Sequence, residues 1–344
     1  MMIRLNNDYS EGCHPSILLR LNEMNLEQNP GYGTDTHCAE AADAVRKAFA
    51  CPDADVHFLV GGTQANMTVI AAALRPYEAV LCADTGHINV HETGAVEGTG
   101  HKCIALQSRD GRISASQISV AAAMLDDNEH VAKPAMVYIS MSTELGTVYN
   151  RAQLRDIYLT CQQLGLYLFI DGARLGYGLM AKGTDVTLAD IAKLTDVFYI
   201  GGTKVGALFG EAVVIMNESL KKDFRFIMKQ RGGRLAKGRL LGVQFDALFT
   251  DDLYFRISRH AIEMAHQIRD IFVSAGYPPL FDSPTNQQYP IMPDDELAEI
   301  GKSFGYEYWE RVDETHSGVR FCASWATTQE NVDALRAAVQ ALKK

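Results

Sequence analysis

The chain has 344 residues, 47% of them hydrophobic and 22% charged, and carries a formal net charge of −10. It has room for one large and one smaller domain, and its negative charge argues against nucleic acid or an anionic membrane surface as a partner. No apolar run is long enough to span a membrane and no signal-peptide core is present. Seven cysteines without a CxxC pair favour reduced thiols in the cytoplasm over disulfides or a zinc site.

The first two thirds of the chain alternate short apolar runs with helical patterns. Residues 1–20 are polar and predict an arm rather than a core element. Beyond the arm we expect strands at 56–60, 79–83, 136–141, 166–170, 197–200 and 211–216, and helices at 38–49, 64–75 and 152–165. Strands that alternate with helices predict an α/β fold with a mostly parallel sheet covered on both faces.

The pattern changes after Gly242. We expect a long helix over about 252–275, a strand near 288–292, a helix near 295–304, a strand at 319–324 and a terminal helix at 329–342. This order predicts a smaller α+β unit. We therefore divide the chain into an arm (1–20), a large domain (21–245) and a small C-terminal domain (246–344).

Two charged residues follow buried strands and point to a cofactor. Asp171 comes directly after the apolar run 166–170, and Lys204 lies 33 residues later, beyond the run 197–200. Charged groups at buried strand ends are costly and need a partner or a function. An enzyme that uses pyridoxal phosphate needs this pair: the lysine holds the cofactor as a Schiff base, and the aspartate keeps the ring nitrogen protonated.

Gly61-Gly62-Thr63 follows the strand at 56–60 and begins a helix. Free N–H groups and the positive end of a helix dipole form a natural phosphate site there, although Gly-Gly turns are also common without a ligand. The Thr203 hydroxyl is a further phosphate donor, or an ordinary turn residue.

The loops after two other strand ends carry possible proton-transfer groups. His87 could stack on a cofactor ring and exchange protons with the substrate, or be a loop histidine bonded to the backbone. Glu92, in the same loop, could only orient a neighbour. Glu144 follows the strand at 136–141 and is a candidate general base, or a solvated carboxylate.

Two arginines are candidates for binding a substrate carboxylate. Arg174 could reach that carboxylate, hold Asp171 ionised, or form a structural ion pair. Arg320 begins a strand of the small domain and would clamp a carboxylate in an interdomain cleft, or lie at a sheet edge. The basic stretch 229–242 is typical of a solvated helix face, but it could lend Arg234 or Lys237 to a phosphate across a subunit interface.

Together these residues resemble the fold-type I pyridoxal-phosphate enzymes, and within them the low-specificity L-threonine aldolases of the β-eliminating lyase superfamily. The resemblance covers nearly the whole chain. Its motifs occur in order as NNDYSEG, GYGTDT, GGTQAN, ADTGHINVHETGA, IDGARL, GGTKVG and RFCASW. The ordered set is specific, although no single motif is.

The resemblance implies a role for each matching residue. Lys204 forms the Schiff base, Asp171 pairs with the pyridine nitrogen and His87 stacks on the ring. The phosphate is expected to bind Gly62, Thr63, Gln64 and Thr203. The substrate carboxylate is expected to bind Arg174 and Arg320. Asn7 and Tyr32 fall where the family has active-site residues, and Tyr32 is expected to come from a partner subunit.

The sequence departs from the family pattern at two places. Many members have a Thr-His pair where this chain has Thr143-Glu144, so a base role of that histidine cannot be transferred. Many also have Ser-Lys-Gly where this chain has Thr203-Lys204-Val205. The departures affect the expected substrate more than the expected cofactor.

The resemblance implies cleavage of the Cα–Cβ bond of L-threonine, L-allo-threonine or a similar β-hydroxy-α-amino acid to glycine and an aldehyde. Phenylserine cleavage and β-elimination on the same scaffold remain open. A catalytically silent relative should lack Lys204, Asp171 or Arg320, and the chain has all three. The family also implies a homodimer or homotetramer with active sites at the dimer interface.

Overall fold

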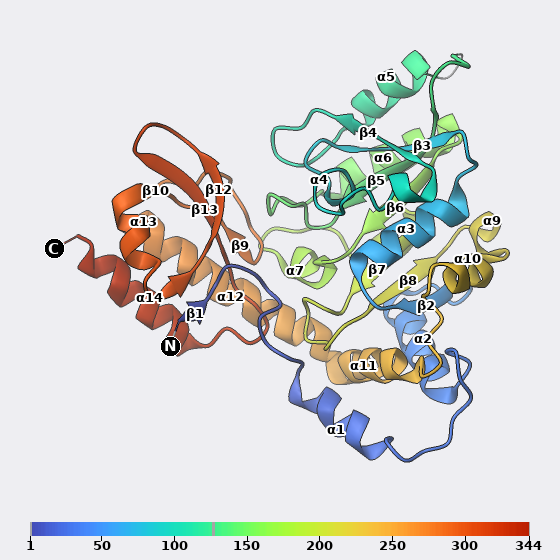
Figure 1. The fold of residues 1–344 in the computed structure, drawn as a ribbon, viewed down its shortest axis with the longest axis horizontal. Coiled ribbons are helices and arrows are strands. Elements are labelled where there is room, and N and C mark those ends of the chain that lie inside the picture. The colour runs from blue at the N-terminus through green and yellow to red at the C-terminus, as the bar shows by residue number, and fades with distance from the viewer. Residues whose placement is uncertain (1, 126–127, 344) are drawn as a thin grey trace.

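The computed structural model describes residues 2–125 and 128–343. A layered α/β part holds most of the chain, and a smaller part lies to one side of it (Figure 1). The long helix α12 (Leu253–Ser274) runs from the first part to the second.

The central sheet of the described residues has the strand order β2-β8-β7-β6-β5-β3-β4. In that order the strands are Asp55–Leu59, Glu211–Ile215, Val197–Gly201, Tyr167–Asp171, Lys133–Ser140, Glu78–Ala83 and Lys102–Leu106. Strand β8 is antiparallel to both neighbours, and the other pairs are parallel. The prediction of a mostly parallel sheet is confirmed.

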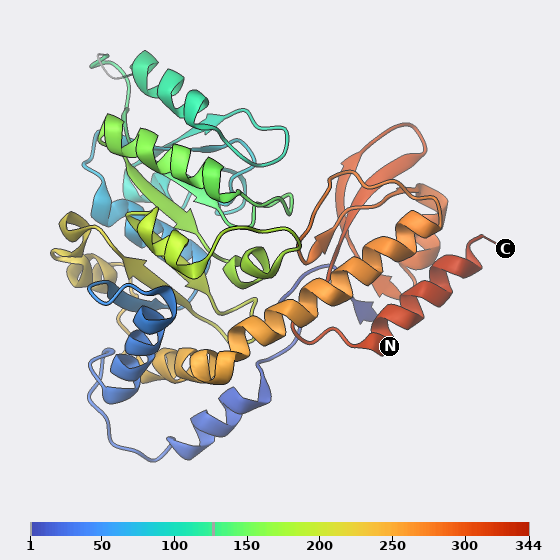
Figure 2. The ribbon, with the colours of Figure 1, turned by 180° about the vertical axis from the view of Figure 1, so that it is seen from behind.

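The sheet is buried on both faces because its strands are apolar at nearly every position. Tyr138, Phe169 and Tyr199 pack in one hydrophobic cluster with α3 and α10. Ile170 and Phe198 point the other way and join a cluster with α2, α6 and α11. Figure 2 shows α2 and α6 on the face turned toward the viewer. Alternating side chains thus fix which helices cover each face.

Most helices of the described residues outside α12 begin after a polar or glycine residue. Their bounds are α1 Pro15–Glu23, α2 Thr36–Phe49, α3 Gly62–Ala73, α4 His87–Val90, α5 Ala115–Leu125, α6 Arg151–Leu164, α7 Leu175–Met180, α8 Leu188–Lys193, α9 Glu218–Lys221, α10 Phe224–Gln230, α11 Arg239–Phe249, α13 Asp294–Ile300 and α14 Gln329–Ala341. In α6, Asn150 and Gln153 form a reciprocal capping box and Gly165 ends the helix in the left-handed region.

The smaller part contains an antiparallel sheet. Its strands are β9 (Gln287–Gln288), β10 (Ile291–Pro293), β12 (Glu307–Arg311) and β13 (His316–Cys322). The apolar faces of α12 and α14 pack together with this sheet in a separate cluster around Phe272, Phe321 and Leu335.

The N-terminal arm belongs spatially to the smaller part. Its strand β1 (Ile3–Arg4) pairs in parallel with β11 (Phe304–Gly305), and Cys322 donates to the carbonyl of Leu5 at 2.6 Å. The arm then passes beside the carboxyl edge of the central sheet before α1 packs against α11. It therefore contacts both parts of the molecule.

The structure differs from the expected elements mainly by additions. Strands β1, β4, β11 and β12 and helices α1, α4, α5 and α7 to α11 are further elements that the apolar patterns did not predict. The proposed division at residue 245 falls inside α11, so the domain boundary stays a proposal. None of the helices in the described ranges is long and apolar enough to cross a membrane.

Candidate active site

The carboxyl ends of β5, β6 and β7 border a cavity of about 350 Å³. Both Asp171 and Lys204 line this cavity, as the strand pattern predicts. A second cavity of about 470 Å³ shares Lys204, His87, Glu144 and Arg174 with the first and extends to Arg320 of the smaller part. The two cavities together form the candidate site.

Asp171 is the last residue of β6 and is only 4% exposed. Its carboxylate accepts hydrogen bonds from the hydroxyls of Tyr138 and Tyr199, both at 2.5 Å, from Asn66 Nδ2 at 3.1 Å and from the N–H of Ala173 at 2.9 Å. Burial opposes its ionisation, but the charge of His87 and the tyrosine hydrogen bonds outweigh burial and hold the pKa below its ordinary value. An ionised Asp171 suits a protonated ring nitrogen.

The three side chains that bind Asp171 were missed from the sequence. Tyr138 and Tyr199 lie in apolar strands, where the sequence gives no reason to distinguish them from ordinary core residues. The only signal is that both point to the same sheet face, where their hydroxyl groups need an acceptor. Asn66 is a polar residue buried in α3.

Two glycines of the sequence motifs lie so close to Tyr199 that little or no room is left for a side chain. A Cβ atom at Gly172 would lie 1.8 Å from the carbonyl oxygen of Tyr199, so the loop after β6 can only pass β7 without a side chain. A Cβ atom at Gly62 would lie 3.0 Å from the Tyr199 hydroxyl, which donates to Asp171.

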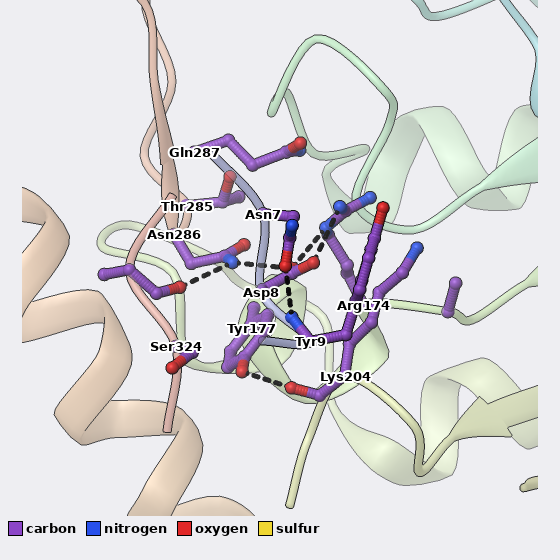
Figure 3. Close-up of polar contacts among 12 residues, drawn as sticks. Asn7, Asp8, Tyr9, Arg174, Tyr177, Lys204, Thr285, Asn286, Gln287 and Ser324 are labelled. Atoms are coloured by element: carbon purple, nitrogen blue, oxygen red, sulfur yellow. Dashed lines mark hydrogen bonds and ion pairs between the residues drawn. The ribbon is translucent and has the colours of Figure 1, made fainter. Parts of the chain in front are cut away.

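Lys204 lies in the turn that follows β7 (Figure 3). Its carbonyl oxygen accepts a hydrogen bond from the Tyr177 hydroxyl at 2.6 Å, which anchors the turn. Burial, followed by the charge of Arg174, lowers the pKa of the Lys204 amine. A lysine with a lowered pKa is more often neutral and therefore a better nucleophile.

The two residues before Lys204 are held by a buried carboxyl group. The Thr203 hydroxyl donates to Glu211 Oε1 at 2.9 Å and accepts from the N–H of Gly210 at 3.0 Å. Glu211 Oε2 accepts from the N–H of Gly202 at 3.2 Å, and burial raises the Glu211 pKa to about 8. Because the Thr203 hydrogen is engaged, its contact with a phosphate stays a prediction.

The predicted phosphate site is formed by the first turn of α3. Gly62 and Thr63 line the cavity, and Gly61 precedes them without a side-chain cap on the helix. Gln64 is tied elsewhere: its Oε1 accepts from the N–H of Val60 at 3.1 Å and its Nε2 donates to the carbonyl of Arg231 at 3.0 Å. Its role at a phosphate also stays a prediction.

His87 opens α4 and faces the same cavity. Its Nδ1 lies 2.8 Å from Oε1 of Glu92, whose side chain is fully buried and also accepts from Asn66 at 2.7 Å. An ionised carboxylate can only accept, so Nδ1 carries the proton. Glu92 thus orients the imidazole, and Asn66 connects it with Asp171.

Glu144 is brought next to His87 by the loop after β5. Its Oε1 accepts from the Ser140 hydroxyl at 2.7 Å and from the N–H of His87 at 3.1 Å, while its carbonyl accepts from the Tyr289 hydroxyl at 2.6 Å. Burial raises the Glu144 pKa. A raised pKa brings a carboxyl group closer to neutral pH, where proton transfer is efficient.

The two arginines converge on the second cavity. Arg174 Nε and Nη2 donate to the two carboxylate oxygens of Asp8, at 2.7 and 3.0 Å, and not to Asp171. Arg320 Nη2 donates to the carbonyl of Asn6 at 3.1 Å. Asp8 is a further residue that the sequence reading missed.

Besides Gln64, three predicted residues line neither of the two cavities. Tyr32 is 45% exposed, and Lys229 Nζ lies 4.6 Å from the centre of its ring. Lys237 is also exposed. Asn7 Oδ1 accepts from the N–H of Tyr9 at 3.0 Å and so orients the residue that lines both cavities.

The residues present fit pyridoxal phosphate. The cavity is lined by the ionised carboxylate of Asp171, by the Lys204 amine with its lowered pKa and by the uncapped start of the 12-residue helix α3. Within the described residues no group of three or more His, Cys, Asp or Glu side chains is suited to a metal ion.

Comparisons with known proteins agree with this geometry. Residues 10–340 match the family model described as beta-eliminating lyase. The chain is 31% identical to the low specificity L-threonine aldolase of Pseudomonas aeruginosa, covering 95% of this chain and 94% of the relative, and 30% identical to that of a Pseudomonas species, covering 98% and 96%. A solved structure of Leishmania major threonine aldolase superimposes with a TM-score of 0.98 at 42% identity, covering 99% of this chain and 100% of that one.

A more distant solved structure, a putative L-allo-threonine aldolase from Listeria monocytogenes, gives a TM-score of 0.77 at 18% identity and shows the fold alone. The match of residues 10–340 spans almost the whole chain, and the Pseudomonas relatives cover it nearly end to end. The chain therefore belongs to the beta-eliminating lyase family.

Proposed function

We propose that the protein is a pyridoxal-phosphate-dependent lyase that cleaves the Cα–Cβ bond of L-threonine and L-allo-threonine to glycine and an aldehyde. The observation that carries the proposal is the common cavity of Lys204 and the ionised Asp171, with Arg174 and Arg320 on the adjoining wall. The names of the Pseudomonas and Leishmania relatives support the same reaction.

Asp171, Lys204, His87, Thr203 and the first turn of α3 would hold the cofactor. When bound, pyridoxal phosphate supplies a ring that accepts electrons from a bond broken at the substrate Cα. Lys204 would supply the amine that attaches the cofactor and a base beside Cα, while Asp171 would hold a proton at the ring nitrogen. His87 lines the cavity and is oriented by Glu92, so it could stack on the ring.

Arg174 and Arg320 would hold the substrate carboxylate. Both line the second cavity beside Lys204, and planar guanidinium groups match the geometry of a carboxylate. Holding the carboxylate fixes the orientation of Cα, which decides whether the bond to Cβ or the bond to hydrogen is broken.

Glu144 or His87 would take the proton from the β-hydroxyl. The two groups are neighbours, since the Glu144 carboxylate accepts from the N–H of His87 at 3.1 Å. A positioned proton-transfer group contributes about 10²- to 10⁴-fold to a rate. Glu144 occupies the place where many family members have histidine, so this chain would use a carboxylate for the same step.

A second candidate substrate is a β-aryl analogue such as phenylserine. The second cavity is lined by Tyr9, Tyr308 and Trp309, which offer aromatic surface to an aryl group. β-Elimination from a substrate with a leaving group on Cβ remains a third reaction of the same machinery.

We also propose a cytoplasmic homodimer or homotetramer with active sites at the subunit interface. Exposed Tyr32 and Lys237 lie outside the cavities of their own chain and would complete the site of a partner, with Lys237 near the phosphate. The seven unpaired cysteines suit a reducing compartment.

The test is a visible absorption spectrum of the purified protein with added pyridoxal phosphate, followed by L-threonine and detection of acetaldehyde. We expect the absorption band of a lysine-bound cofactor, and acetaldehyde and glycine in equal amounts. A band without acetaldehyde would move the activity to phenylserine cleavage or β-elimination. No band would contradict the cofactor assignment.

A further inference from the structure

Asp8 is a buried charged residue to which neither the sequence nor the proposed reaction assigns a role. It is 0% exposed and lies where the N-terminal arm passes the carboxyl edge of the central sheet. Burial opposes its ionisation, but the charges of Arg174 and Lys204 and the hydrogen bonds from Arg174 and Asn286 together outweigh burial and lower the Asp8 pKa to about 2. A fully buried carboxylate that stays ionised must be held by strong partners.

Asp8 joins three separate segments of the chain. Arg174 of the large part donates to both carboxylate oxygens, and Asn286 Nδ2 of the smaller part donates to Oδ2 at 2.9 Å (Figure 3). Asn286 Nδ2 also donates to the carbonyl of Ala323 at 2.9 Å, so the amide is fixed by the small sheet. One carboxylate therefore connects the arm and both parts of the molecule.

The contact with Asp8 leaves one side of Arg174 available. Nε and Nη2 are engaged, whereas Nη1 has no hydrogen-bond partner among the described residues, and Arg174 lines both cavities. A bidentate ion pair fixes the plane of a guanidinium group. The remaining nitrogen of Arg174 is thus presented to a ligand in a set orientation.

The second arginine, Arg320, is held by residues that lie next to or near Asn286 and Asp8 in the chain. Arg320 Nη2 donates to the carbonyl of Asn6, and Nη1 donates to Oε1 of Gln287 at 3.3 Å. Residues 6–8 and 286–287 therefore position both arginines, whose side chains line the second cavity.

We propose that Asp8 is a positioning residue for the substrate-carboxylate site: it orients Arg174 through two hydrogen bonds and, with Asn286, keeps Arg174 and Arg320 on the same cleft. This role rests on the proposed function in one respect, since it takes the ligand of the two arginines to be an α-carboxylate. Asp8 touches neither the substrate nor the cofactor and acts through Arg174.

The test compares two ligands that differ only in the carboxylate. Glycine and methylamine are titrated against the cofactor-loaded full-length protein, as wild type and as Asp8→Asn, and the ratio of their affinities is measured. We expect Asp8→Asn to weaken glycine about 10- to 100-fold and methylamine less than about twofold, because only glycine uses Arg174. Equal losses for both ligands, or an unchanged ratio, would overturn the proposal.

A matched control is Asp246→Asn. Asp246 also ties the N-terminal segment to the large part, through an ion pair with Arg20, but it lies outside both cavities. This variant should bind both ligands as the wild type does. A loss in Asp246→Asn that equals the loss in Asp8→Asn would assign the effect to the attachment of the arm and contradict the role of Asp8.

A second variant keeps the proposal testable if Asp8→Asn does not fold. Asn286→Ala retains the Asp8–Arg174 pair but removes its support from the smaller part, so glycine affinity should fall by about 3- to 10-fold with methylamine unchanged. An unchanged ratio would contradict the coupling. Threonine cleavage is measured on the wild type in parallel. If the protein binds glycine but does not cleave threonine, the proposed function is overturned. The ratio of glycine to methylamine affinity still tests the role of Asp8 in that case.

Discussion

The two ends of the candidate site are built differently. At the cofactor end, Asp171 receives four hydrogen bonds, two of them from tyrosines on neighbouring strands of one sheet. At the carboxylate end, Arg174 and Arg320 come from different parts of the molecule and are positioned by the arm. The four donors to Asp171 all belong to the large part, whereas the groups that hold Arg174 and Arg320 belong to the arm and the smaller part.

This difference separates two tasks. A sheet holds its strand ends rigidly, which suits a cofactor that stays bound through many turnovers. A site shared between two parts and an arm can adjust when a small ligand enters and leaves. We therefore expect substitutions at the cofactor end to lower the rate of the reaction itself, and substitutions at the carboxylate end to change the affinity for the substrate.

The largest effect is expected for Lys204→Ala, which removes the amine at the cofactor end. The absorption band of the lysine-bound cofactor should disappear, and threonine cleavage should fall by roughly 10⁴-fold or more. The spectrum and the rate are the two measurements. Lys193→Ala, on the exposed surface of α8, should change neither, and a retained band in Lys204→Ala would contradict the lysine assignment.

Glu144→Gln should lower kcat by about 10²- to 10⁴-fold if the carboxylate transfers the β-hydroxyl proton. Glutamine keeps an acceptor for Ser140 and for the N–H of His87, so the loop should stay in place. Because burial raises the Glu144 pKa, wild-type activity should fall as the pH drops through that pKa, and the variant should lack this acidic limb. A pH profile with the same limb in both proteins would move the proton transfer to His87.

Arg320→Lys tests the carboxylate end. Lysine cannot reproduce the planar contacts, so the KM for L-threonine should rise by about 10- to 100-fold while the cofactor absorption stays unchanged. Arg311→Lys is the control, because Arg311 lies on the adjacent strand β12 and pairs with Asp294 outside the cavity. Loss of the cofactor band in Arg320→Lys would show that the two ends are not separate.

The smallest effect concerns stability. Folding raises the Glu211 pKa from 4.5 to about 8, so between these values the unfolded chain is ionised while the folded one stays protonated. Glu211 therefore makes the cofactor-free protein less stable as the pH rises through this window, by at most about 1.4 kcal/mol per pH unit. Glu211→Gln should become more stable than the wild type between pH 5 and 8, measured by urea unfolding. The exposed Glu40→Gln should follow the wild-type curve, and parallel curves for Glu211→Gln would contradict the raised pKa.

The sequence reading worked best where chemistry follows directly on a strand. Asp171, Lys204, Gly62 and His87 all come after apolar runs, and parallel strands bring their carboxyl ends to one edge. It worked less well for side chains inside the runs. Tyr138 and Tyr199 look like core residues in one dimension, and their hydroxyl groups acquire a role only when β5, β6 and β7 are neighbours.

Residues of the arm were the hardest to assign. Asp8 stands in a polar segment with no periodic pattern, so nothing in its surroundings indicates that it is buried. Arg174 was expected at the substrate carboxylate, at Asp171 or in a structural ion pair, and the structure pairs it with Asp8, a partner that the sequence did not name. That contact joins residues 166 positions apart, and local sequence cannot choose among possible partners at such a separation.

The sequence alone determined the fold class, the placement of Asp171 and Lys204 beyond buried strands, and the order of the motifs, because hydrophobic periodicity and short turns are local properties of a chain. Only the tertiary structure decided which carboxylate each arginine meets, which hydroxyls reach Asp171, and that Glu144 lies beside His87. Those contacts depend on how the sheet, the arm and the smaller part pack. Packing is set by the whole set of buried side chains rather than by any one segment.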